Sequence, residues 1–89
     1  MLKYTNYFVN TRLRPDRKEI KDEWIEMVIG QPLDKKIQAD GRIKCWGKII
    51  DDQGKERYLR VILLEDGETI HNAFFDRRFR GESNANSIL

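Results

Sequence analysis

The one histidine of the chain is the residue best suited to proton transfer near neutral pH. His71 has an unperturbed pKa close to neutrality, so its side chain can accept or donate a proton. Cleavage of RNA by its own 2′-hydroxyl needs a proton acceptor, a proton donor and cations for the charge that develops on the phosphorus oxygens. Four residues fit these roles without a metal, and they form the candidate catalytic set: His71, Arg60, Tyr58 and Lys48. The alternative is a structural histidine on a strand.

A second group of residues has the composition of a nucleic-acid contact. Its cations can hold phosphates, and its tryptophan, like the tyrosine of the first group, can stack on a base of single-stranded RNA. The candidate nucleic-acid-binding residues are Arg42, Lys44, Trp46, Arg77, Arg78 and Arg80. The alternative is an ordinary solvent-facing sheet surface, with Phe79 folded back on the edge of the core and some arginines paired with Asp76 or with helix carboxylates.

Composition argues against several other kinds of chemistry. The chain has 89 residues, a net charge of +2 and one cysteine, Cys45, so we expect no disulfide, no zinc site and no cofactor. The acidic residues outside the helix fall mainly in turns, and no phosphate loop, nucleophile elbow or dinucleotide fingerprint occurs. Without a signal peptide or an apolar run that could span a membrane, the prediction is a cytoplasmic protein with no membrane association.

Helical spacing of apolar residues predicts one main helix over about 20–29. Ile20, Trp24, Met27 and Val28 form its buried stripe, which Ile25 and Ile29 widen. Either Asp16, with Glu19 three residues on, or Asp22 can serve as the N-cap. Residues 31–40 are expected to be a connector, and residues 2–9 a short strand or an irregular segment pinned by its aromatics.

Alternation predicts that residues 42–50 and 57–64 are half-buried antiparallel strands. Ile43, Cys45 and Ile49 point to one face of the first strand, and Arg42, Lys44, Trp46 and Lys48 point to the other. Asp40-Gly41 signals a tight turn before this strand, and Gly47 suggests a bulge or a close approach of other backbone.

The turn Glu65-Asp66-Gly67-Glu68 links the second of these strands to a third in a hairpin. With a two- or four-residue loop, Leu64 faces Thr69 and Leu63 faces Ile70. One face then holds Leu59, Val61, Leu63, Ile70 and Phe74, and the other holds Tyr58, Arg60, Ile62, His71, Ala73 and Phe75. A three-residue loop would slip the pairing by one residue and turn His71 towards the face of Val61.

The resulting prediction is an α+β domain, with one main helix packed on a three- to four-stranded antiparallel β-meander. Residues 1–80 form this single domain. Residues 81–89 lack periodicity and are expected to be a flexible tail.

Two stretches of the sequence resemble a known family. WGKI at Trp46 to Ile49 and YLRV…DGETIHNAFFDRRF from Tyr58 to Phe79 are similar to the small prokaryotic domains related to BrnT-type toxins, grouped with the RelE/ParE-like ribonuclease toxins. The similarity covers roughly residues 8–80 and implies a helix packed on an antiparallel sheet. It also implies metal-independent RNA cleavage and a cognate antitoxin. Relatives often carry a histidine before the helix, where this chain has Asn10 and Arg12, so no catalytic residue transfers by position.

The leading hypothesis is therefore a toxin-like RNA-binding domain that could act as a ribonuclease. The alternative is a non-enzymatic interaction module or a homodimer that pairs through an exposed strand edge or the aromatic N-terminus. Tyr4, Tyr7 and Phe8 motivate this alternative, because they are more aromatic surface than a small monomer usually exposes.

Overall fold

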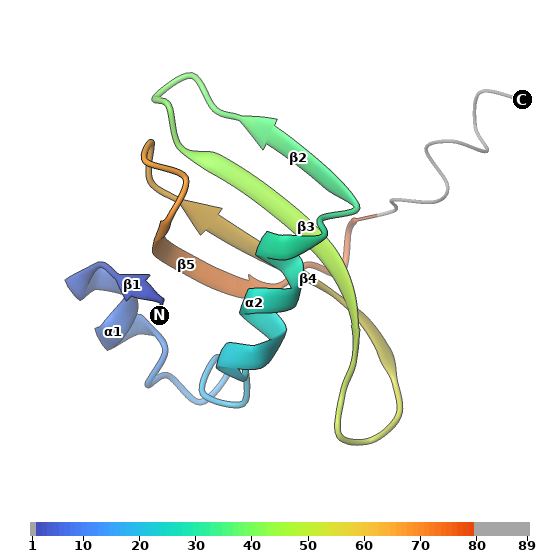
Figure 1. Cartoon of the computed structure of the whole chain (residues 1–89). Coiled ribbons are helices and arrows are strands. Elements are labelled where there is room, and N and C mark those ends of the chain that lie inside the picture. The colour runs from blue at the N-terminus through green and yellow to red at the C-terminus, as the bar shows by residue number, and fades with distance from the viewer. Residues whose placement is uncertain (1, 80–89) are drawn as a thin grey trace, which may run out of the picture.

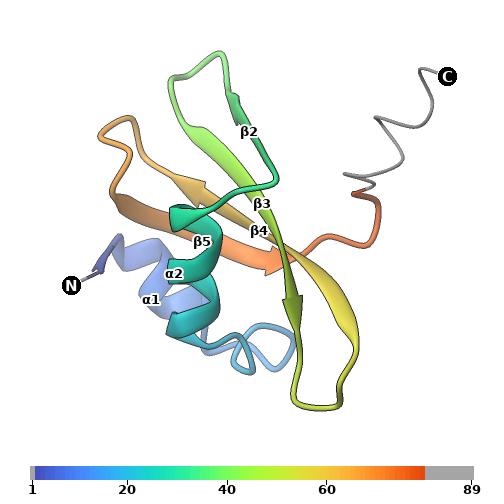
Figure 2. The same ribbon diagram turned by 45° about the vertical axis from the view of Figure 1, so that its right-hand side comes forward.

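The computed structural model describes residues 2–79, which form a five-stranded sheet with two helices over one face (Figures 1 and 2). The strands are β1 (Lys3–Tyr4), β2 (Asp34–Ile37), β3 (Ile43–Ile50), β4 (Glu56–Leu63) and β5 (Thr69–Phe75), and the helices are α1 (Asn6–Thr11) and α2 (Asp22–Gly30). Strands β2 to β5 form an antiparallel meander, and β1 adds to β5 in parallel. The predicted α+β class is confirmed, but the sheet is mixed and larger than predicted. The predicted tail over 81–89 lies outside the described residues.

Helix α2 is the predicted main helix, shifted by two residues at its start. It buries Trp24, Ile25 and Val28, as the spacing predicted, whereas Met27 is 57% exposed and does not belong to the buried stripe. The predicted N-caps are wrong, because Lys21 occupies this position without a side-chain cap bond. Asp22 instead lies in the first turn, where a carboxylate interacts favourably with the helix dipole.

The N-terminal segment is mostly helical rather than extended. Only Lys3–Tyr4 pairs as a strand, and the chain then enters α1 at Asn6. The Thr5 side chain caps this helix by accepting a hydrogen bond from the Phe8 backbone N–H at 3.1 Å. The sequence contains the signal for this helix, namely the Thr cap, and the ring of Tyr4, which precedes the cap, packs 5.5 Å from that of Phe8.

Strand β2 lies within the stretch that was expected to be a connector. It pairs with β3 across the turn at Asp40-Gly41, and the Gln38 N–H donates to the Arg42 carbonyl at 2.7 Å. Gly41 has a φ of +92°, which favours glycine. The Asp-Gly turn was correctly predicted, but the strand before it was missed because Lys35 and Lys36 interrupt its apolar pattern.

The β4–β5 hairpin begins in the predicted register and then changes it. The Leu64 N–H donates to the Thr69 carbonyl and Leu63 pairs with Ile70, so the four-residue loop is confirmed. A bulge at His71 then shifts the pairing by one residue, so that Ile62 opposes Asn72. The sequence assignment is therefore wrong beyond the bulge.

This shift decides which residues near the C-terminal end of β5 face the core. Ala73 is fully buried, and the Phe75 ring lies 6.2 Å from that of Trp24 on the helix side of the sheet. Phe74 lies on the opposite face, where it contacts the guanidinium of Arg60. The one inserted residue thus moves Ala73, Phe74 and Phe75 each to the face opposite the predicted one.

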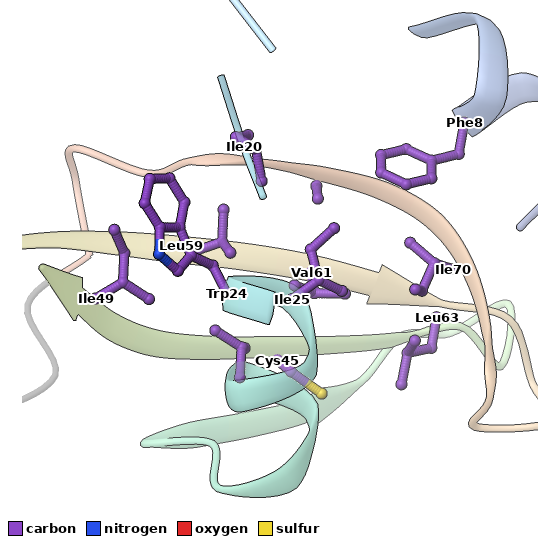
Figure 3. Packing of buried hydrophobic residues seen from close by; sticks show 12 residues of the cluster. Phe8, Ile20, Trp24, Ile25, Cys45, Ile49, Leu59, Val61, Leu63 and Ile70 are labelled. Carbon is purple, nitrogen blue, oxygen red and sulfur yellow. The ribbon is translucent and has the colours of Figure 1, made fainter. Parts of the chain in front are cut away.

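The core fills the space between the two helices and the central strands (Figure 3). Figure 3 shows Phe8 of α1, Ile25 of α2 and Ile70 of β5 directed into this space. Each fully buried side chain of this size stabilises the fold by about 1.5–3 kcal/mol. Gly47 permits the close approach of α2, because a Cβ atom there would lie 2.8 Å from Cγ2 of Val28. The predicted close approach at this glycine is confirmed.

Candidate nucleic-acid interface on the outer sheet face

The sheet face opposite α2, here called the outer face, carries most of the predicted functional residues. The β3–β4 register places Trp46 opposite Arg60 and Lys48 opposite Tyr58. The alternation of β3 was therefore interpreted correctly, since Cys45 and Ile49 are buried on the helix side. The structure thus brings these four predicted site residues onto one surface.

Asp76 binds two of these residues at the centre of the outer face. Its Oδ2 accepts a hydrogen bond from Trp46 Nε1 at 2.9 Å, and two from Arg60, at 3.1 Å from Nε and 2.6 Å from Nη2. Its Oδ1 accepts the backbone N–H of Arg78 at 3.0 Å. Burial acts to raise the pKa of Asp76, but the hydrogen bonds from Trp46 and Arg60 outweigh it and hold the pKa below its usual range. Asp76 is therefore an ionised carboxylate in a nearly closed network.

Phe79 covers this network from outside. Its ring stacks on Trp46 with 5.2 Å between centroids and an interplanar angle of 10°, and it meets Tyr58 edge-on at 5.2 Å. Trp46 is consequently only 6% exposed. Phe79 does fold back, as predicted, but onto the outer face. The predicted base-stacking surface of Trp46 is occupied by a ring of the protein itself.

His71 lies apart from this network, at the bulge of β5. Its Nδ1 is 3.1 Å from Oγ1 of Thr5, and its ring stacks on Tyr7 with 4.9 Å between centroids. Burial, with a further contribution from the positive charge of Arg42, holds the pKa of His71 below its usual value. The imidazole is therefore mainly uncharged at neutral pH.

The four predicted catalytic residues do not converge on one point. Arg60 pairs with Phe74, which is three residues from His71 along β5, or roughly 10 Å at the usual strand rise. The Arg60 guanidinium donates to Oδ2 of Asp76, and Nζ of Lys48 lies 3.8 Å from Oε2 of Glu56. The cation that influences His71 is Arg42, a residue predicted for RNA binding and not for catalysis.

A further cationic part of the outer face lies along β2 and β3, where Lys36 is exposed and Lys44 is half-buried. Lys36 and Lys44 are directly opposite each other, and neither has an ion pair within residues 2–79. Arg42 lies beside them, and within the described residues its one ion pair is a distant one, with Nε 3.8 Å from Oδ2 of Asp40. Lys36 was not predicted, because β2 itself was not predicted.

A shallow pocket of about 330 Å³ opens next to these lysines. Its lining consists of Asp34, Lys36, Trp46, Arg60, Asp76, Arg78 and Phe79. Arg78 is exposed and lines the same hollow as Lys36. Arg77 lines a different pocket beside Tyr58 and Glu56, and Arg80 lies outside the described residues.

Comparisons of the chain with protein-family models, with curated proteins and with solved structures gave no match. Within residues 2–79, no group of histidine, cysteine and carboxylate side chains is arranged to hold a metal ion. No helix in this part of the chain has the length and apolar character needed to cross a membrane.

Proposed function

We propose that this protein is a toxin-like RNA-binding domain of the BrnT-related kind that its sequence resembles. The observation that supports this proposal best is the pair Lys36 and Lys44. Like charges directly opposite each other on a sheet destabilise it, and a bound anion relieves this repulsion. Arg42 and Arg78 extend the same positive surface, as a chain of phosphates would require.

The proposed contact is with the phosphate backbone rather than with stacked bases. Trp46 lies beneath Phe79, so no exposed indole is available for stacking. Binding should therefore be largely independent of RNA sequence and strongly dependent on salt. With three or four phosphates contacted, the logarithm of affinity should fall against the logarithm of salt with a slope of roughly −2 to −3.

The test is fluorescence anisotropy of a labelled single-stranded oligouridylate, measured from about 50 to 200 mM salt. The double variant Lys36→Gln, Lys44→Gln should bind more weakly and with a shallower slope. The matched control is Lys18→Gln, Lys55→Gln, which makes the same charge change at exposed lysines away from this surface. Equal loss in the two double variants would show that only net charge matters. Absence of binding by the wild type would refute the function.

The ribonuclease part of the proposal rests on His71. An uncharged imidazole can accept the proton of a 2′-hydroxyl, and Arg42, whose charge already acts on His71, is better placed than Arg60 to supply positive charge, because Arg60 is bonded to Asp76. Expression in bacteria should then slow growth and degrade RNA with the wild type but not with His71→Asn. Unchanged growth and intact RNA with the wild type would exclude catalysis while leaving RNA binding open to the anisotropy test.

The aromatic N-terminus gives little support to the alternative of an interaction module. Phe8 is 2% exposed and Tyr4 packs against it, so both serve the core of the protein itself. Tyr7 is half exposed but stacks on His71. The homodimer and the antitoxin implied by the resemblance therefore remain proposals, and light scattering at high concentration tests the first of them.

A further inference from the structure

The open edge of the sheet at β2 has backbone groups that can pair with another strand (Figure 2). The pairing of β2 with β3 continues to Gln38, whose N–H donates to the Arg42 carbonyl at 2.7 Å. In an antiparallel pair, alternate residues direct their backbone groups to the partner strand. Lys36 therefore bonds towards β3, whereas the N–H and C=O groups of Lys35 and Ile37 point to the open edge.

The helix side of this edge carries an exposed apolar strip. Leu33, just before β2, is 53% exposed, and Ile37 at the end of β2 is 74% exposed. Leu33 lines a shallow hollow of about 580 Å³ with Met27 of α2, which is itself 57% exposed. Ile37 lies on the same side, because it is opposite Ile43, which packs against the core. Three large apolar side chains are thus left in water along one edge.

The sequence of this edge is complementary to itself when two copies run antiparallel. With Lys35 opposite its own copy, Leu33 of each chain faces Ile37 of the other on the helix side. In the same register, Asp34 of each chain faces Lys36 of the other on the outer face, where both residues lie. The register therefore forms two apolar pairs and two pairs of opposite charge, against a single pair of like charges at Lys35.

The backbone of the edge fits the same register. Because the N–H and C=O of Lys35 point outwards, two copies can exchange both hydrogen bonds at the two-fold axis. In the single chain the Lys35 N–H donates to Oδ1 of Asp34 at 2.8 Å, so a carboxylate occupies the place of the second copy's carbonyl. This bond is local and exposed, and its exchange costs little. The Asp34 carboxylate can then pair with Lys36 of the other copy.

We propose that two copies of this chain pair through their β2 edges, in the antiparallel register centred on Lys35, so that their sheets become continuous. Ile37 of each copy then lies beside the hollow formed by Leu33 and Met27 of the other. Removal of these side chains from water supplies a driving force that the charges alone do not. The proposal goes beyond RNA binding and does not depend on it.

Other occupants of this edge fit less well. A register centred on Lys36 places Lys36 opposite itself and Lys35 opposite Ile37, so it forms neither the apolar pairs nor the pairs of opposite charge. An acidic segment of another protein would meet the Asp34 carboxylate as well as Lys36 on the outer face. A second copy is therefore the better match, and the small size of the contact predicts weak, reversible association.

The test is sedimentation velocity of the full chain without RNA, where the wild type should associate with a dimer Kd on the order of 100 μM. Asp34→Lys and Lys36→Asp each turn both pairs of opposite charge into like pairs and should weaken the dimer about tenfold. An equimolar mixture of these two variants restores opposite charges at both pairs and should form a heterodimer of nearly wild-type affinity. A wild type that is monomeric at about 1 mM, or a mixture no more associated than its components, would overturn the proposal.

Two further comparisons separate the register from net charge. Lys55→Asp makes the same charge change as Lys36→Asp at an exposed position in the β3–β4 loop, and should neither weaken the dimer nor restore association with Asp34→Lys. Lys35→Thr removes the like charges at the two-fold axis and should tighten the dimer about threefold, whereas Lys55→Thr should leave it unchanged. Restoration by Lys55→Asp, or equal effects of Lys35→Thr and Lys55→Thr, would overturn the proposal, because net charge would then govern association.

Discussion

Removal of the Asp76 carboxylate should destabilise the protein more than any single substitution on its exposed surface. Asp76 is 9% exposed, and its Oδ2 accepts bonds from Trp46 and Arg60. Asp76→Ala leaves a largely buried guanidinium without its counter-charge and an indole N–H without an acceptor. Breaking a buried ion pair costs about 3–5 kcal/mol. Because the Arg60 side chain is 26% exposed, water compensates in part, and we expect about 3 kcal/mol.

Urea unfolding followed by tryptophan fluorescence measures this loss. For a domain of this size, about 3 kcal/mol corresponds to a fall in Tm of roughly 15 °C. The control is Asp52→Ala, which breaks an exposed ion pair with Lys21 and should change stability by less than about 1 kcal/mol. The double variant Asp76→Ala, Arg60→Met should recover part of the loss, since it no longer contains the unpaired guanidinium. A loss below about 1 kcal/mol in Asp76→Ala would refute the reasoning.

The same network predicts how stability depends on pH. The folded pKa of Asp76 lies below its value in the unfolded chain, about 3.9. Its contribution is therefore fully present above the unfolded pKa and is lost as the pH falls through the folded pKa. The difference in stability between wild type and Asp76→Ala should accordingly shrink in acid, as measured by urea unfolding at a series of pH values. A constant difference down to the lowest pH would contradict this assignment.

Three further predictions concern other parts of the fold. Gly47→Ala should cost about 1–3 kcal/mol, because its Cβ would lie 2.8 Å from Val28, while Gly30→Ala meets nothing within 4 Å and should stabilise α2 by about 0.5–1 kcal/mol. Urea midpoints measure both, and equal effects would contradict the packing argument. His71 should titrate below about 6.5 in NMR spectra of its ring protons, so that its contribution to stability is present above that pH and lost as pH falls through the folded value. Arg42→Gln should raise this pKa part of the way back, and an unchanged value would contradict the electrostatic contribution.

Local patterns in the sequence were sufficient for the elements whose burial has a regular period. The two faces of β3 follow from alternation, because the pleat sends successive side chains to opposite sides whatever else the chain does. The stripe of α2 follows from helical spacing for Trp24 and Val28. Met27 was misassigned because the width of the covered stripe depends on the shape of the neighbouring sheet.

The sequence by itself thus determined the α+β class, the main helix, the antiparallel pairs from β3 to β5 and the loop of the last hairpin. Tertiary structure alone decided the bulge at His71, because the β1 segment and Thr5 fix this part of β5 from 66 residues away. It also decided that Phe79 covers Trp46, since the path of the chain after β5 is not periodic. The residues of the candidate site could therefore be named from the sequence, but their partners could not, because contacts between distant segments set which charges are neutralised and which remain exposed.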